Sequence, residues 1–255
     1  MKSIYNKLPA VIALLIILLI WLLISEFEIV PAYMLPSPID VGKVFIGDID
    51  TILMHSVVTL QETIYGLLLG IILAFIIATV MDRFIILDKA CYPLIVITQT
   101  IPTIAIAPLL VLWMGFGMAP KIALVVITTF FPIAIGLLDG YKSVDIDSLD
   151  LMRSMGANRL QIFRHVKLPA ALPHFFSGLQ ISSSYAVVGA VVAEWLGGFE
   201  GLGVYMTRVK KAYAFDKMFA VIIFIVIISL LLMLVVKAIR RASMPWEAVA
   251  REKDN

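Results

Sequence analysis

Apolar residues in this chain gather into six long intervals that contain no Asp, Glu, Lys or Arg. The intervals hold between 17 and 31 residues and cover residues 8–25, 63–81, 90–120, 122–138, 168–193 and 218–236. A helix of about 20 residues crosses about 30 Å of hydrocarbon, and in lipid every backbone N–H and C=O needs a partner within the protein. The pattern therefore predicts six transmembrane helices in an all-α polytopic membrane protein.

Prolines predict two departures from a simple helical bundle. Proline lacks a backbone N–H and crowds the preceding turn, so we expect a kinked or interrupted helix in the third interval, which holds Pro93, Pro102 and Pro108. Further prolines break the chain after the first interval, and the mixed stretch at residues 39–54 is typical of a surface helix.

Composition supports a single transmembrane domain over residues 1–255. The chain is 62% hydrophobic and 15% charged, whereas soluble domains average about 45–50% and about 25%. Lys2 and Lys7 before the first interval also resemble a signal peptide, but no small-x-small cleavage site follows, which favours a retained amino-terminal helix at residues 8–25. The single cysteine, Cys91, cannot form an internal disulfide.

The distribution of basic residues predicts the topology. Six spans place both termini on one side, and with that side inside, 14 of the 20 Lys and Arg residues lie in inner segments and 6 in outer ones. This matches the excess of Lys and Arg in cytoplasmic loops, so we expect both termini to be cytoplasmic. The net charge of +2 then needs no nucleic-acid partner.

The inner segment from Asp139 to Pro173 is polar and patterned. Asp147 or Ser148 can cap a first short helix, Gly156 can end it, and Asn158 with Gln161 resembles a capping box that starts a second helix ending at Leu168 and Pro169. The pattern alone leaves two interpretations open. The segment is either a helix pair resting on anionic headgroups or a docking site for a cytoplasmic protein.

Residues 150–158, followed by Ile162 and the Leu168–Pro169 pair, resemble the EAA loop of ABC importer permeases. Asp150 takes the place of the glutamate, and Leu151 and Met152 replace the two alanines. Further blocks resemble the subfamily that serves aliphatic sulfonates, taurine, nitrate and thiamine-pyrimidine precursors; they are Leu35–Pro38, Ile101–Pro102, Ala107–Leu109, Leu112–Gly117, Val192–Gly197 and Gly201–Gly203.

The resemblance implies a type I importer permease with a five-helix core, here residues 57–239, plus the amino-terminal helix. It implies two permease copies in a bacterial cell membrane, a homodimer in our interpretation, with cytoplasmic ATPase subunits and an extracellular solute-binding protein. Residues 140–173 would then be the coupling segment, and the residues expected to meet the ATPase are Asp150, Leu151, Met152, Arg153, Gly156, Ile162 and Phe163. No cofactor is expected in this chain, because the phosphate-binding pattern GxxxxGK[ST] is absent from it. ATP and magnesium would belong to the ATPase.

Polar residues at membrane depth are candidates for the substrate path. Gln99, three residues before Pro102, is the foremost candidate, and the others are Thr98, Thr103, Ser183 and Tyr185. The alternative is that these hydroxyls bond to backbone or to neighbouring helices. Because no Arg or Lys lies inside a predicted span, a neutral or weakly charged solute such as a pyrimidine precursor is favoured slightly over a sulfonate, taurine or nitrate.

Charged residues at the outer boundary predict a partner contact. Most basic residues lie in inner segments, but three lie together in an outer segment, namely Arg208, Lys210 and Lys211. We expect these three to contact the binding protein. Glu62 and Glu194 border spans on this side, where we expect hydrated carboxylates that anchor the helices or pair with outer basic residues. The three histidines are scattered, so a metal site is not expected.

Two other functional classes would require different sequence patterns. A membrane-embedded enzyme needs a concentrated reactive set such as HExxH, and a stand-alone secondary transporter usually carries ionisable residues at the midplane and inverted repeats. The sequence displays neither pattern.

Overall fold

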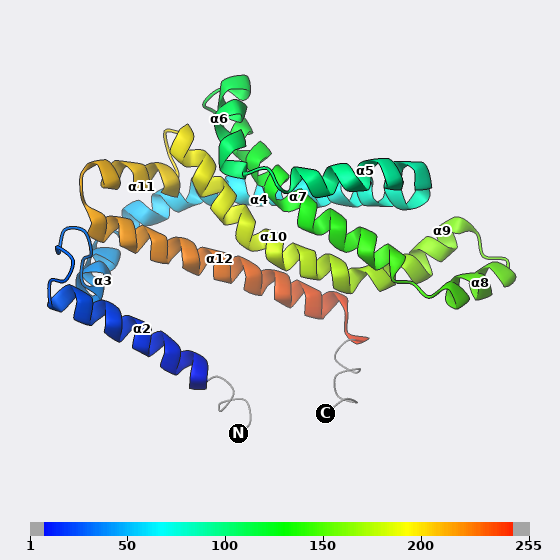
Figure 1. The fold of residues 1–255 in the computed structure, drawn as a ribbon, viewed down its shortest axis with the longest axis horizontal. Helices are drawn as coiled ribbons and strands as arrows, with labels where there is room; N and C mark the ends of the chain where they lie inside the picture. Colours follow the sequence, from blue (N-terminus) through cyan, green and yellow to red (C-terminus); the bar gives the residue numbers. More distant parts are fainter. Residues whose placement is uncertain (1–7, 247–255) are drawn as a thin grey trace.

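The computed structural model describes residues 8–246, and this part of the chain is helical throughout with short connections (Figure 1). Lys2, Lys7, Arg251 and Lys253, which enter the predicted charge bias, lie outside the described residues. The elements are α2 (Leu8–Glu26), α3 (Pro38–Gly47), α4 (Ile49–Arg83), α5 (Ile85–Thr98), α6 (Thr103–Met114), α7 (Ala119–Lys142), α8 (Ile146–Ser154), α9 (Arg159–Ile162), the π-helical turn η1 (Phe163–Lys167), α10 (Leu168–Leu196), α11 (Leu202–Lys211) and α12 (Phe215–Ser243).

Five helices of the described residues are long and apolar enough to cross a membrane, and the pair α5 and α6 makes a sixth span if it is counted as one. The two helices of that pair meet at 99°, so the interrupted helix predicted for the third interval is confirmed. The stretch predicted to form a surface helix is divided between two helices, α3 and the start of α4. The side chain of Ser37 caps α3 by accepting from the Asp40 N–H at 3.1 Å, but from Ile49 onward the chain already belongs to α4.

The core forms where α4, α7 and α10 pack together, and small residues permit this close approach. A Cβ added at Gly66 would lie 2.5 Å from Val125 Cβ, and one at Gly140 would lie 2.5 Å from Ala171 Cα. The pattern of Gly66 and Gly70 in α4 thus serves the contact with α7. Ala74, Ile133 and other apolar side chains fill the centre.

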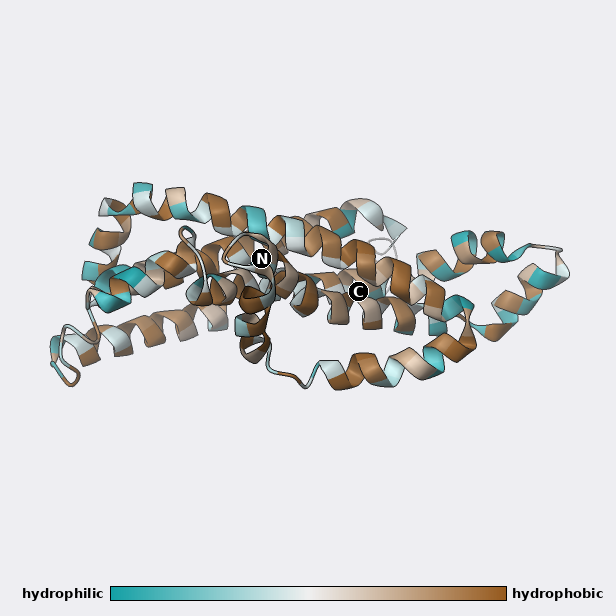
Figure 2. Ribbon diagram, turned by 90° about the horizontal axis from the view of Figure 1, so that it is seen from above, coloured by the Kyte–Doolittle hydropathy of each residue, from teal (hydrophilic) through white to brown (hydrophobic). Residues whose placement is uncertain are grey.

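The long helices are rich in apolar residues (Figure 2), and many of their large apolar side chains are exposed, as expected for contact with lipid. Only 6% of the apolar window of α2 is buried. This helix is held at its end, where Trp21 Nε1 donates to the Pro36 carbonyl at 3.1 Å and the Trp21 ring lies 5.6 Å from that of Phe219. The exposed aliphatic surface of α2, α4 and α12 would be unstable in water and is suited to hydrocarbon.

The two ends of the bundle differ, and we name them after their helices. At the α8 end, α8 and α9 protrude beyond the ends of α4 and α7, whereas α3 and α11 lie at the opposite, α11 end (Figure 1). The predicted stop at Leu168 and Pro169 is wrong, because η1 leads directly into α10 and the helix runs through Pro173. Each proline removes only one N–H donor, and the packing of α10 on α7 keeps the helix continuous.

Candidate translocation and coupling sites

A cavity of about 360 Å³ lies at the break between α5 and α6. α5 ends at Thr98, and Pro102, which has no N–H, precedes α6. The break brings together four of the predicted path residues, since Thr98, Gln99, Thr103 and Tyr185 all line the cavity. None of its described lining residues is charged; the remainder are Ile101, Pro102, Ile106, Ile127, Thr128, Phe131 and Pro132.

Ser183, the fifth predicted path residue, lies away from this cavity. It is fully buried, and its hydroxyl donates to the Gln180 carbonyl at 2.7 Å. Tyr185 faces the opposite way and is 54% exposed. Two residues advance a helix by about half a turn, so the face of α10 that carries Ser183 packs inside the bundle while the face of Tyr185 borders the cavity.

The predicted coupling segment protrudes, and capping residues set its local structure. Asp145, rather than the predicted Asp147 or Ser148, caps α8 by accepting from the Asp147 N–H at 3.4 Å. Gly156 has φ +78°, a conformation that L side chains rarely adopt. The predicted capping box is confirmed, because Asn158 Oδ1 accepts from the Gln161 N–H at 2.9 Å and Gln161 Oε1 accepts from the Asn158 N–H at 2.7 Å.

The predicted coupling residues divide into two groups. Leu151 is 63% exposed, Met152 is half-buried, and Asp150 pairs with Arg153 at 2.6 Å with both side chains in solvent. Ile162 and Phe163 instead pack inward, with the Phe163 ring 5.5 Å from that of Tyr141. Ile162 and Phe163 therefore anchor the segment to the bundle, and the α8 residues form its free surface.

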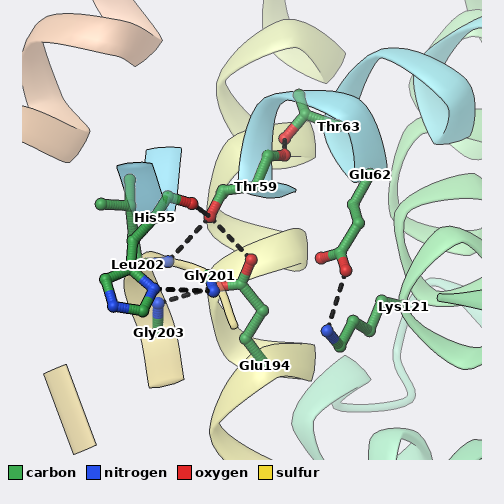
Figure 3. Close-up of polar contacts among 9 residues, drawn as sticks. All are labelled: His55, Thr59, Glu62, Thr63, Lys121, Glu194, Gly201, Leu202 and Gly203. Atoms are coloured by element: carbon green, nitrogen blue, oxygen red, sulfur yellow. Dashed lines mark hydrogen bonds and ion pairs between the residues drawn. The ribbon is translucent and has the colours of Figure 1, made fainter. Parts of the chain in front are cut away.

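A buried polar cluster joins α4, α7, α10 and α11 at the α11 end (Figure 3). Glu62 and Glu194 are 0% and 2% exposed, so the expectation of hydrated carboxylates is wrong. The expected basic partner exists for Glu62, because Lys121 Nζ donates to Glu62 Oε1 at 2.8 Å. Glu62 Oε2 has no hydrogen-bond partner among the described residues.

Glu194 and its neighbours hold the start of α11 (Figure 3). Glu194 Oε1 accepts from the Thr59 hydroxyl at 2.7 Å and Oε2 accepts from the Gly203 N–H at 2.6 Å. The preceding N–H groups are also bound, since Leu202 donates to Thr59 Oγ1 at 2.9 Å and Gly201 donates to His55 Nδ1 at 3.2 Å. A helix start leaves its first N–H groups without intrahelical partners, and side chains of α4 and α10 bind them here.

Gly201 is required at this turn for two reasons. Its φ is +119°, which L side chains rarely adopt, and an added Cβ would overlap the Glu194 carboxylate. His55, expected to be isolated, is 4% exposed and stacks on Tyr205 with ring centres 5.2 Å apart. Burial raises the pKa of Tyr205 above its usual range, and the Asp48 carboxylate that accepts the hydrogen bond of the Tyr205 hydroxyl raises this pKa further.

The basic residues of α11 lie on its exposed face. Arg208, Lys210 and Lys211 are exposed, and Arg208 Nη2 also donates to the Phe199 carbonyl at 2.6 Å. Arg208 and Lys211 border a cavity of about 550 Å³ together with Trp195. No cluster of His, Cys, Asp and Glu suited to a metal ion occurs within residues 8–246.

Comparisons with known proteins identify the family of this chain. Residues 66–246 match the family described as "Binding-protein-dependent transport system inner membrane component". A probable ABC transporter permease protein of Haemophilus influenzae is 40% identical over 85% of this chain and 89% of its own length. The formylaminopyrimidine transport permease protein ThiX of Halalkalibacterium halodurans is 36% identical over 96% of this chain and 98% of its own.

The fold is also found among solved structures. A chain of the MetNI methionine ABC transporter in an inward-facing conformation superposes with a TM-score of 0.65, at 22% identity, over 75% of this chain and 95% of that one. The fold, the family match and the sequence relatives agree. This chain belongs to the family of binding-protein-dependent transport system inner membrane components, and it is a multi-pass permease subunit of an ABC importer.

Proposed function

We propose that two copies of this chain enclose a path for a small neutral heteroaromatic solute. The uncharged cavity at the break between α5 and α6 carries the proposal. It combines the rings of Tyr185 and Phe131 with the amide of Gln99, and these groups suit a planar ring that stacks and accepts or donates hydrogen bonds. Leu112 and Trp113, in the last turn of α6, are 77% and 71% exposed, and a second copy of the chain would cover this face of α6.

The relatives support the same substrate class. The relative at 36% identity is described as a formylaminopyrimidine permease, and one from Chloroflexus aurantiacus at 30% as a riboflavin permease. A taurine permease of Escherichia coli is 29% identical. A sulfonate carries a full negative charge and binds most strongly to cationic donors, and the described lining of the cavity offers no cation.

The coupling segment would dock on the cytoplasmic ATPase through Leu151 and Met152, flanked by the Asp150–Arg153 pair. Both termini would then be cytoplasmic, in agreement with the charge bias of the sequence. An apolar side chain that fills a groove transmits displacement by steric contact. Gly156 permits a close backbone approach because, apart from its two chain neighbours, no described residue has an atom within 4 Å of its Cβ position. The chain itself would perform no chemistry, since the ATPase holds ATP and magnesium.

At the α11 end, Arg208, Lys210 and Lys211 would contact the extracellular solute-binding protein. Their exposure leaves them accessible to acidic side chains, and such charged pairs at an interface raise the rate of encounter. The Arg208 bond to Phe199 fixes part of this surface. We expect reversal of these charges to slow uptake, and unchanged uptake would remove this contact from the proposal.

The path is tested by substituting Gln99 in the complete transporter reconstituted with its ATPase and binding protein. Gln99→Leu should reduce uptake of a labelled aminopyrimidine about tenfold, the effect of losing a bond of roughly 1.4 kcal/mol, and leave assembly unchanged. Thr100→Val is the matched control, because Thr100 bonds to the Ile97 carbonyl and does not line the cavity. Equal uptake by wild type and Gln99→Leu, or preferential uptake of taurine, contradicts the proposal.

A further inference from the structure

A third cavity, of about 590 Å³, lies at the α8 end between the last turn of α4 and the coupling segment. Its lining joins cations to apolar side chains, among them Arg83, Arg159, Leu160 and Phe163. Arg83 ends α4, and Phe163 begins η1, which leads into α10, so the cavity lies where two membrane-spanning helices reach their polar ends. A ligand at that depth needs both a polar and an apolar part.

The cavity carries excess positive charge. Its acidic lining residue, Asp82, is neutralised by Lys167, whose Nζ donates to both carboxylate oxygens at 2.7 and 2.9 Å. Arg83 and Arg159 have no ion-pair partner among the described residues. Guanidinium groups present a planar fork of N–H donors that matches phosphate oxygens.

Helix α8 turns one face to this cavity and another away from it. Leu149 and Arg153 are four residues apart and line the cavity. Leu151 and Met155, also four apart, are 63% and 74% exposed. Because residues i and i+4 share a helix face and residue i+2 lies opposite, a partner on the Leu151 face leaves the cavity to a different occupant.

We propose that this cavity binds the phosphate headgroup of an anionic phospholipid, with acyl carbons against Leu160 and Phe163. The site rests on the proposed function for its orientation, which puts the α8 end in the cytoplasmic leaflet. Basic pockets at that boundary attract anionic headgroups, and the unpaired guanidinium groups are the complementary charge. α8 packs extensively against no other described element, so a lipid bridging Arg83 of α4 and Arg159 of α9 would brace the coupling segment.

The test compares lipid retention by the complete transporter in nanodiscs of phosphatidylcholine with a minority of phosphatidylglycerol. Native mass spectrometry after mild delipidation counts the phosphatidylglycerol that remains. The variant Arg83→Gln/Arg159→Gln should retain about thirty-fold less phosphatidylglycerol than wild type, because each cation near an anionic surface contributes about 1 kcal/mol. The control Arg164→Gln/Arg241→Gln removes two exposed arginines outside the cavity and should retain lipid as wild type does.

Three results would overturn the lipid site. Equal retention by wild type and the cavity variant rejects it outright. Protection of a Leu160→Cys thiol by inorganic phosphate in pure phosphatidylcholine discs assigns the cavity to a free anion, and a cross-link from that cysteine to the ATPase assigns it to protein. Co-purification of the ATPase is measured separately, so failure of the coupling role is distinguished from failure of the lipid site.

Discussion

One ion pair at each end of the helix bundle illustrates two different ways of holding charged side chains. At the α11 end Glu62 and Lys121 are buried at 2.8 Å, whereas at the α8 end Asp150 and Arg153 pair at 2.6 Å with side chains about 60% exposed. The distance between the charged atoms is similar in the two pairs, but their exposure to solvent differs. An exposed pair contributes little to stability, and a buried pair is costly to break because it leaves an uncompensated charge. We infer that the buried polar cluster makes the α11 end rigid, and that the exposed side chains of the α8 end are covered when partner proteins bind.

The largest effect is expected at Lys121. Lys121→Met leaves Glu62 with no hydrogen-bond partner among the described residues, since Lys121 holds Oε1 and Oε2 has none. Loss of one member of a buried pair costs about 3–5 kcal/mol. Thermal unfolding of the purified permease in detergent should show a clearly lower midpoint than wild type.

The double variant Lys121→Met/Glu62→Met is the control for Lys121→Met. Replacing both members of a buried pair by apolar side chains is often neutral, so the double variant should recover most of the lost stability. If the double variant unfolds at the same temperature as Lys121→Met alone, the pair does not account for the loss.

A second test concerns the side chains that bind the start of α11. Thr59→Val removes both the donor to Glu194 and the acceptor of the Leu202 N–H. A buried group left without its partner costs about 1–3 kcal/mol, so the unfolding midpoint should fall, by less than in Lys121→Met. Thr59→Ser retains the hydroxyl and should unfold close to wild type, and an equal loss in both variants would assign the effect to packing of the methyl group.

The sequence predicted the spans well because hydrophobic length is a local property of the chain. The break before Pro102 and the capping box at Asn158 were also predictable, since proline and capping residues act on neighbouring backbone. The buried polar cluster at the α11 end was not predictable from the sequence. Thr59 and Glu194 are 135 positions apart, and a carboxylate near a span end has the same local signal whether it is hydrated or buried.

The predicted path residues of α10 also show that local sequence does not reveal which side chains face a site. Ser183 and Tyr185 are both polar and lie two positions apart, yet only Tyr185 borders the cavity at the helix break. The pattern of hydrophobic residues in α10 does not reveal which face packs on α7, because a span surrounded by lipid and protein is apolar on all sides.

At the α8 end, the third test separates coupling from stability. Gly156→Trp strains a residue with φ +78°, but strain at a single exposed position costs about 1–3 kcal/mol. Apart from the two chain neighbours, no described residue has an atom within 4 Å of an added Cβ. The variant should insert and assemble, yet binding-protein-stimulated ATP hydrolysis by the reconstituted transporter should be abolished. Gly47→Trp, at another glycine with no atom within 4 Å of its Cβ position, is the control, and normal turnover in Gly156→Trp would refute the coupling role.

The smallest effect on stability is expected at the exposed pair of α8. Asp150→Asn removes a charge from the ion pair with Arg153, but solvent screens such pairs to a few tenths of a kcal/mol. The unfolding midpoint should therefore stay within error of wild type, while a contact of this pair with the ATPase would appear as weaker, salt-dependent association. Association measured at low and high ionic strength decides between these roles. An unfolding midpoint lowered as far as in Lys121→Met would contradict the contrast between the two ends, because an exposed carboxylate would then stabilise the bundle as much as a buried one.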